Sequence, residues 1–355
     1  MKVMAVGGIF ELLEALRGSG NIELSVLDHP SLLTRIKKEG VADQTFPFST
    51  GAKIDLRAIL AIRHAIRRVR PDIVHAFSSR SLANAVLATA GMAEPPKLIS
   101  FRGAASVASR HDWGFRLAYL NPRVAGHACA SDAVRQAMIQ SGIPPEKCVT
   151  VYDCVRARNL ERPGRSALAE WGVPPDAFVI GTVATIRPVK GIDLLLKASI
   201  LCADLRDIYW VLIGPLHDRE VERLAQDARI RDRIRLLGLR TDAKALISGA
   251  DLFVLPSRAE GLSLALLEAM SQRVCPVVSD AGGMKEVVRH GRDGLVVPKE
   301  DAGALAEAVC TLHADRKRVA AFAESSSRRI AETFTAEKMA ERTRELYHRV
   351  ITQSP

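Results

Sequence analysis

The chain has 355 residues, of which 48% are hydrophobic and 25% charged, as in an ordinary globular protein with room for two domains. Aromatic residues make up only 5%, which argues against a protein built on base stacking or on aromatic platforms for sugars. The net charge of +10 favours anionic partners such as phosphorylated substrates or an anionic membrane. This charge is spread along the chain without a lysine- or arginine-rich block, so we expect no nucleic-acid partner.

Cysteine usage and hydropathy place the chain in a reducing compartment. The six cysteines form neither a C-x-x-C pair nor a zinc-binding spacing, and several lie in apolar runs. We therefore expect buried thiols and no metal site. The first apolar run is too short for a signal peptide, and no stretch of 18 or more apolar residues occurs. These features predict a cytoplasmic protein whose contact with the inner face of the cytoplasmic membrane, where it occurs, is peripheral.

The first half of the chain alternates short apolar strands with helices, as nucleotide-binding α/β domains do. A strand over 2–6 ends in Gly7 and Gly8, which indicate either a tight turn or a loop near a phosphate. Further strands are expected at 23–27, 71–75, 97–101, 124–130 and 148–152, and helices at 9–17, 31–39, 55–69, 82–90 and 132–140.

The helix expected at 55–69 has one apolar face and one basic face. The basic face carries Arg57, Arg63, Arg67, Arg68 and Arg70. A crossover helix with a solvated face is the favoured interpretation, and a helix that lies on an anionic membrane is the alternative.

Four side chains of the first half are candidate site residues. His75, His111 and His127 are more typical of structural or solvated histidines. Arg102 stands at a strand's carboxyl end beside a glycine, where a fixed cation can meet a phosphate or a sugar acid. The irregular segment 104–113 after it is a candidate substrate loop.

The second half repeats the alternation, with strands at 178–183, 209–213, 234–237, 252–255, 274–278 and 295–297. Alternation at this spacing predicts right-handed βαβ units and a parallel sheet. The fold class is therefore α/β, with two tandem doubly wound Rossmann-like domains. We place the first domain at 1–153, a polar linker at 154–166, the second domain at 167–334 and a terminal helical segment at 335–355; closing helices are expected at 300–323 and 336–351.

The segment 250–270 organises the second half. A buried strand is followed by a short loop containing Glu260 and by an almost wholly apolar helix, predicted from 262 to 270, that contains Glu268. A carboxylate in such a helix is costly unless it is paired, so Glu268 either pairs with an arginine or accepts hydrogen bonds from ligand hydroxyls. Gly261 permits close backbone approach, and the amides of Leu262 and Ser263 are expected to face an anion.

Two cations stand just before the helix expected from residue 192. Arg187 and Lys190 oppose the dipole of this helix, which sequences tolerate where an anion binds. Two solvated loop charges are the simpler interpretation when this segment is taken alone. Because Glu260 and Glu268 follow a neighbouring strand, we favour a clamp on a diphosphate.

The spacing Glu260-x7-Glu268, within PSRAEGLSLALLEAM, resembles the signature of retaining glycosyltransferases of family 4, which have the GT-B fold. The resemblance implies that Glu260 contacts the donor sugar and Glu268 the ribose, with Arg187 and Lys190 on the diphosphate. It also implies that Gly7-Gly8 lies near the donor phosphates and the acceptor and that Gly282-Gly283 lies near the donor. The last helix is implied to cross back onto the first domain.

The chain departs from the family pattern at several positions. Arg187 is three residues before Lys190, where the commoner family spacing is five. Arg102 replaces a histidine found in many members, and Asp153 with Cys154 replaces an Asn-Gly pair. The longer Gly-Gly-Ala-Glu loop that many members have after the first strand is missing.

The sequence therefore predicts a metal-independent, cofactor-free retaining glycosyltransferase. A UDP- or GDP-linked sugar is the expected donor and a glycan or lipid-linked molecule the acceptor, in cell-surface polysaccharide or lipopolysaccharide synthesis. Two alternatives stay open: a GT-B-like nucleotide-sugar epimerase, and a non-catalytic nucleotide-sugar-binding protein.

Overall fold

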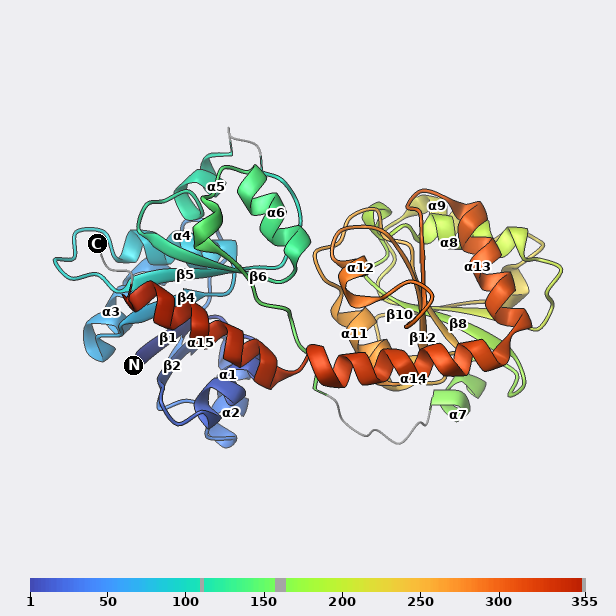
Figure 1. Cartoon of the computed structure of the whole chain (residues 1–355), viewed down its shortest axis with the longest axis horizontal. Coiled ribbons are helices and arrows are strands. Elements are labelled where there is room, and N and C mark those ends of the chain that lie inside the picture. The colour runs from blue at the N-terminus through green and yellow to red at the C-terminus, as the bar shows by residue number, and fades with distance from the viewer. Residues whose placement is uncertain (109–111, 157–163, 353–355) are drawn as a thin grey trace. The chain divides into compact units, whose positions relative to one another are not determined.

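The computed structural model describes residues 1–108, 112–156 and 164–352, which form two compact units (Figure 1). Unit 1 contains Met1–Cys154 and the segment that begins at Ala336, and unit 2 contains Val155–Thr335. Most of the linker predicted at 154–166 lies outside the described residues. Its last residues begin helix α7 (Gly164–Ala169) of unit 2, so that end of the segment is not a free connection.

Unit 1 is built on a sheet of seven strands, paired in parallel in the order β3-β2-β1-β4-β5-β6-β7. The strands are β1 (Lys2–Val6), β2 (Glu23–Asp28), β3 (Gln44–Pro47), β4 (Ile73–Ala76), β5 (Lys97–Arg102), β6 (Val124–Cys129) and β7 (Cys148–Thr150). Strand order reverses between β1 and β4, which makes the loops after these two strands the switch point of the sheet. The edge strand β3 was not predicted from the sequence, because it is short and largely lacks the apolar side chains of a buried strand.

Helices cover both faces of this sheet. They are α1 (Phe10–Gly18), α2 (Pro30–Lys38), α3 (Leu56–Val69), α4 (Ser79–Ala88), α5 (Trp113–Ala118), α6 (Asp132–Gln140) and α15 (Ala336–Thr352). Helix α15, drawn in red in Figure 1, packs against α1 and β6. The hydroxyl of its Tyr347 lies 2.8 Å from Nδ1 of His75 on β4, and both side chains are buried. The last helix is therefore an integral part of unit 1.

Unit 2 has a sheet of six parallel strands in the order β10-β9-β8-β11-β12-β13. The strands are β8 (Phe178–Val183), β9 (Ile208–Ile213), β10 (Ile234–Gly238), β11 (Leu252–Leu255), β12 (Cys275–Ser279) and β13 (Leu295–Val297). The switch point falls between β8 and β11. The predicted fold class, two tandem doubly wound α/β domains, is confirmed.

Alternate residues of the unit 2 strands enter two separate cores, one on each face of the sheet. Phe178 and Trp210 belong to the larger core, whereas their neighbours Val179 and Val211 belong to the smaller one. This alternation follows from the two-residue period of a strand, and burial on both faces is why these strands are almost uninterrupted apolar runs.

The remaining helices of unit 2 flank this sheet. They are α8 (Ile192–Leu201), α9 (Arg219–Leu224), α10 (Ala243–Ile247), α11 (Leu264–Ser271), α12 (Met284–Val287), α13 (Ala302–Ala314) and α14 (Arg316–Thr333). The prediction of a single helix at 300–323 is wrong, because α13 ends at Ala314 and α14 begins at Arg316, with Asp315 between them. The side chain of Asp315 caps α14 by accepting from the amide of Arg318 at 2.9 Å.

Candidate functional site

The switch point of unit 2 brings two loops together. The first loop, residues 184–191, joins β8 to α8, and the second, residues 256–263, joins β11 to α11. Ligands of open α/β sheets bind where the strand order reverses, beyond the carboxyl ends of the strands. Both predicted clusters of charge therefore lie where the topology favours ligand binding.

An ion pair joins these loops. Nζ of Lys190 lies 2.6 Å from Oε2 of Glu260, and the two side chains are only 19% and 13% exposed. The same carboxylate oxygen accepts a hydrogen bond from the hydroxyl of buried Ser257 at 3.2 Å. Among the described residues, no donor contacts Oε1 of Glu260, and Lys190 has no second acceptor. Both charged groups therefore keep hydrogen-bonding capacity that a ligand can use.

Arg187 stands beside this pair in the sequence but is exposed, and no described side chain or carbonyl pairs with its guanidinium. The chain reaches α8 through a short 3₁₀ turn (Pro188–Lys190) and then Gly191 at φ 66°. A side chain at Gly191 would collide with the carbonyl of Pro256 in the other loop. Glycine is thus required here both by the left-handed backbone and by the close approach of the two loops.

Arg258, which the sequence analysis did not single out, fastens the two loops to each other. Its guanidinium forms two hydrogen bonds with the buried carboxylate of Asp193, at 2.7 and 2.9 Å, and one with Glu300 at 2.7 Å. It also donates to the carbonyl of Pro188, and its amide donates to the carbonyl of Val189 at 2.9 Å. Arg258 therefore fixes the backbone immediately before Lys190.

Electrostatics within this network are strongly complementary. Burial alone would raise the pKa of Asp193, but hydrogen bonds and charge from Arg258, with help from Lys197, hold that pKa below its usual range. The carboxylate of Asp193 in turn raises the pKa of Arg258 above its ordinary value. Only the charge of Arg258 was visible in the sequence, because its partner Asp193 lies 65 residues away.

The glycine pair after β12, Gly282-Gly283, packs against the backbone of Glu260. Gly282 has φ 51°, and a side chain there would collide with the carbonyl oxygen of Glu260, to which the amide of Gly283 donates at 3.4 Å. The close approach at Gly282 is thus to protein backbone, and it positions the loop that carries Glu260.

Helix α11 differs from the helix predicted at 262–270. It starts at Leu264, with the hydroxyl of Ser263 as its N-cap, so Leu262 and Gly261 precede it. No acceptor among the described residues binds the amides of Leu262 and Ser263. The prediction that Glu268 sits in a helix buried on all sides is wrong: Leu264 is 49% exposed and Glu268, one turn later on the same face, is partly exposed. One face of α11 is therefore open to a ligand, which accommodates Glu268 without full burial.

In unit 1, Gly7 and Gly8 follow β1 at the switch point of that sheet. Gly7 has φ 74°, and its amide donates to the carbonyl of Leu27 at 2.8 Å. A side chain at Gly8 would meet the flexible end of Leu13. The conformation requires glycine at the first position, whereas the second is constrained by packing.

Arg102 lies at the end of β5, on the wall of a cavity of about 310 Å³. Its guanidinium donates to the carbonyl of Ala104 at 3.2 Å and to the hydroxyl of Ser106 at 3.1 Å, and it lies 5.2 Å from the centre of the Tyr119 ring. Trp113, 59% exposed, lies on the same wall. This cavity combines a held cation with aromatic surface in the segment predicted to be a substrate loop.

Two of the candidate histidines, His75 and His127, serve packing in this fold. His75 and His127 are fully buried, and burial lowers the pKa of each to about 3. Nδ1 of His127 lies 2.7 Å from the hydroxyl of Ser100. His111 lies outside the described residues, as do 109 and 110 of the predicted substrate loop.

Across the described ranges, no three His, Cys, Asp or Glu side chains converge as a set of metal ligands. The six cysteines are free thiols; five are buried, and Cys310 is partly exposed, contrary to expectation. None of the helices in the described part of the chain is long and apolar enough to cross a membrane.

Two protein-family models match this chain. Residues 8–158 match "Glycosyltransferase Family 4" and residues 177–315 match "Glycosyl transferases group 1", so the matches cover most of both units. The chain belongs to glycosyltransferase family 4. This agrees with the resemblance found around Glu260 and Glu268.

Curated relatives of this family 4 chain include enzymes of lipopolysaccharide core biosynthesis. The mannosyltransferase LpcC of Rhizobium leguminosarum bv. viciae is 32% identical over 184 residues, which cover 50% of this chain and 52% of the relative. The glycosyltransferase LpsE of Rhizobium meliloti is 24% identical over 79% of this chain and 77% of the relative. The chain spans about half the length of the first of these relatives.

The family 4 chain also shares its fold with solved structures. HepE from Anabaena, in a complex with UDP-glucose, superposes with a TM-score of 0.80 over 98% of this chain and 100% of that one, at 18% sequence identity. A TM-score of 0.77 relates the chain to sucrose-phosphate synthase from Thermosynechococcus elongatus, at 16% identity. The two-domain GT-B fold is therefore established.

Proposed function

We propose that the protein is a retaining glycosyltransferase that moves a sugar from a UDP- or GDP-linked donor to a glycan or lipid-linked acceptor. The observation that carries this proposal is the ion pair of Lys190 and Glu260 at the switch point of unit 2, with unused hydrogen-bonding capacity on both groups. An ammonium and a carboxylate that face one site suit a ligand with an anionic part joined to a hydroxyl-bearing part. A nucleotide sugar has this combination.

In this proposal the donor's diphosphate lies against Lys190 and Arg187, near the amides of Leu262 and Ser263. The bond between the anomeric carbon and the diphosphate breaks, and its electron pair leaves with the nucleoside diphosphate. An acceptor hydroxyl oxygen forms the new bond to that carbon, and its proton passes to the departing diphosphate. Fixed cations and amides stabilise that developing charge, so the proposed chemistry requires no metal ion.

The other site residues hold the parts of the donor that do not react. Glu260 accepts hydrogen bonds from sugar hydroxyls through its unoccupied oxygen, and Glu268 accepts them from the ribose on the open face of α11. Gly261 and Gly282-Gly283 keep the backbone close to the donor. Gly7, Gly8 and Arg102 belong to the acceptor side, where the cavity beside Arg102 offers a cation and aromatic surface.

We further propose a role in cell-surface polysaccharide or lipopolysaccharide synthesis at the inner face of the cytoplasmic membrane. Relatives named for lipopolysaccharide core biosynthesis support this role. Peripheral contact with an anionic membrane is supported by α3, which exposes Leu56 and Leu60, 69% and 57%, among arginines.

The experiment that tests the function follows a radiolabelled donor sugar in the presence of lipid and oligosaccharide extracts. Transfer of label to an extract component, abolished by Glu260→Ala, is the expected result. NMR of the donor with protein alone is the control: an epimerised sugar formed without acceptor would identify an epimerase instead. Tight donor binding in calorimetry with no labelled product would identify a binding protein.

A further inference from the structure

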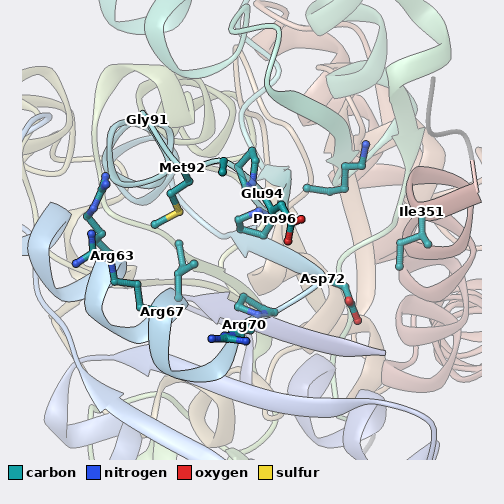
Figure 2. A pocket seen from close by; sticks show the side chains of 14 residues that line it. Arg63, Arg67, Arg70, Asp72, Gly91, Met92, Glu94, Pro96 and Ile351 are labelled. Carbon is teal, nitrogen blue, oxygen red and sulfur yellow. The ribbon is translucent and has the colours of Figure 1, made fainter.

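Unit 1 contains a second cavity, of about 890 Å³. It lies at the amino ends of the strands, whereas Gly7 and Gly8 lie at the carboxyl end of β1. It is bounded by the residues that lead into β4 and β5, such as Asp72 and Lys97. Ligand sites of open α/β sheets lie at the carboxyl ends of the strands, so the switch-point rule does not account for this cavity. Figure 2 shows Arg63 and Arg67 along one side of it and Asp72 and Ile351 on the other.

One stripe of helix α3 supplies the basic side. Leu56, Leu60, Arg63 and Arg67 follow each other at intervals of four, three and four residues, which places them on one face. The opposite face is the buried one and consists of Ala58, Ile62, Ala65, Ile66 and Val69. The stripe therefore begins with two exposed leucines and ends with two arginines that line the cavity.

The cations of the cavity are only partly used by the protein. Arg63 donates to the carbonyls of Ala88 and Ala90, at 3.1 and 2.9 Å, and so closes the end of α4. By contrast, no hydrogen-bond or ion-pair partner of the side chains of Arg67, Arg70 and Lys97 occurs among the described residues. Two carboxylates line the same cavity, Asp72 and Glu94, and the first already accepts from the amide of Lys2 at 2.7 Å.

Arg70 reaches the cavity through an unfavourable backbone conformation. It is the C-cap of α3 at φ 48°, in the left-handed region that residues other than glycine rarely adopt, and Pro71 follows it. Cations near a helix C-terminus are favoured by the helix dipole, which accounts for Arg67 and Arg68 equally. Of these two arginines, Arg67 lines the cavity and Arg68 does not. The helix dipole therefore does not explain why unpaired cations gather in the cavity.

We propose that this cavity binds a phosphate-bearing anion through Arg67, Arg70 and Lys97, independently of the donor. A guanidinium group can donate two parallel hydrogen bonds to two oxygens of one phosphate. The lysine adds a point charge across the cavity. A phospholipid headgroup and a soluble phosphate ester share this chemistry. The exposed leucines on the same stripe of α3 provide apolar surface next to such a headgroup.

Titration calorimetry with inorganic pyrophosphate tests the site. The Lys190→Ala protein serves as the background, because it weakens pyrophosphate binding at the candidate donor site. In that background, Arg67→Ala with Arg70→Ala is expected to weaken the remaining binding about tenfold or more, since charge-assisted hydrogen bonds are lost. The matched control Arg68→Ala, on the same helix but outside the cavity, is expected to leave it unchanged.

Flotation with phosphatidylcholine vesicles, with and without phosphatidylglycerol, identifies the source of the anion. Binding to anionic vesicles that pyrophosphate reverses and that needs Arg67 and Arg70 indicates a lipid headgroup. Pyrophosphate binding at the cavity without a vesicle effect indicates a soluble ester. Binding that is undetectable in the Lys190→Ala background, or that survives the double substitution in a protein with unchanged circular dichroism, would overturn the proposal. The result does not depend on sugar transfer, so the two proposals fail separately.

Discussion

Replacement of Lys190 by alanine and of Glu260 by glutamine, singly and together, tests the centre of the proposed donor site. In the structure the two charges are 2.6 Å apart and each is less than one-fifth exposed. Removing Lys190 leaves the carboxylate poorly solvated and without its cation, which we expect to cost about 1–3 kcal/mol in the free energy of unfolding of unit 2. For a domain of this size, the melting temperature should fall by roughly 2–4 °C for each kcal/mol.

The same substitutions should act differently on ligand binding. Lys190→Ala is expected to weaken binding of free nucleoside diphosphate by about 1.5–3 kcal/mol, or about tenfold to a hundredfold, because it removes a charged hydrogen bond. Glu260→Gln should leave that binding unchanged or tighten it. The reason is that this substitution removes a negative charge that competes with the diphosphate for the ammonium of Lys190. Glu260→Gln should nevertheless abolish sugar transfer, because the proposed contact with the sugar hydroxyls is lost.

A double-mutant cycle separates this reasoning from a purely structural role of the pair. Isothermal titration calorimetry with UDP and GDP gives the binding energies, and denaturant titration gives the unfolding energies. We expect a coupling of at least about 1 kcal/mol in the unfolding energies. Lys190→Ala should lose more diphosphate affinity when Glu260 is already Gln, because the ammonium then binds the diphosphate without a competing carboxylate. Additive effects in both experiments, or unchanged diphosphate affinity in the Lys190→Ala protein, would refute the clamp.

Three further predictions concern other parts of the chain. Arg258→Ala should destabilise unit 2 by about 2–4 kcal/mol in denaturant titration and weaken diphosphate binding, whereas Arg240→Ala, which breaks an exposed pair, should change either by less than about 1 kcal/mol. The pKa of His75 and of His127 is lowered to about 3, below the unfolded value near 6.5, so the unfolded chain binds more protons and stability falls as pH drops below 6.5; at pH 5 the loss is about 2 kcal/mol for each histidine, measurable by denaturant titration at pH 7 and pH 5. Arg102→Ala should slow transfer to acceptor while the calorimetric affinity for nucleoside diphosphate stays unchanged, and a parallel loss of both would place Arg102 on the donor instead.

The sequence was sufficient to predict the fold class because strands buried on both faces are continuous apolar runs. Strands β1, β8, β11 and β13 have the predicted bounds. The edge strand β3 lacks such a run, and the break between α13 and α14 depends on a single cap at Asp315. Local pattern alone did not reveal either feature.

The sequence also indicated the two loops of the candidate site, because helix starts and strand ends are readable from local pattern. It did not show how these loops are held. The contact of Arg258 with Asp193 joins residues 65 positions apart, and Gly282 is needed because of the backbone of Glu260. Both depend on the order of strands in the sheet, which brings β8, β11 and β12 side by side.

The arrangement around Lys190 explains why the proposed donor site carries opposite charges. Either charge alone in a poorly exposed position would be costly, so the pair makes the ligand-free state stable while both groups remain at the switch point. A free diphosphate can engage the ammonium but offers Glu260 few donors in return. A nucleotide sugar supplies both a diphosphate for Lys190 and hydroxyls for Glu260. If the proposed donor site is right, the ion pair favours the intact donor over the product that remains after transfer, a preference that neither charge would produce alone.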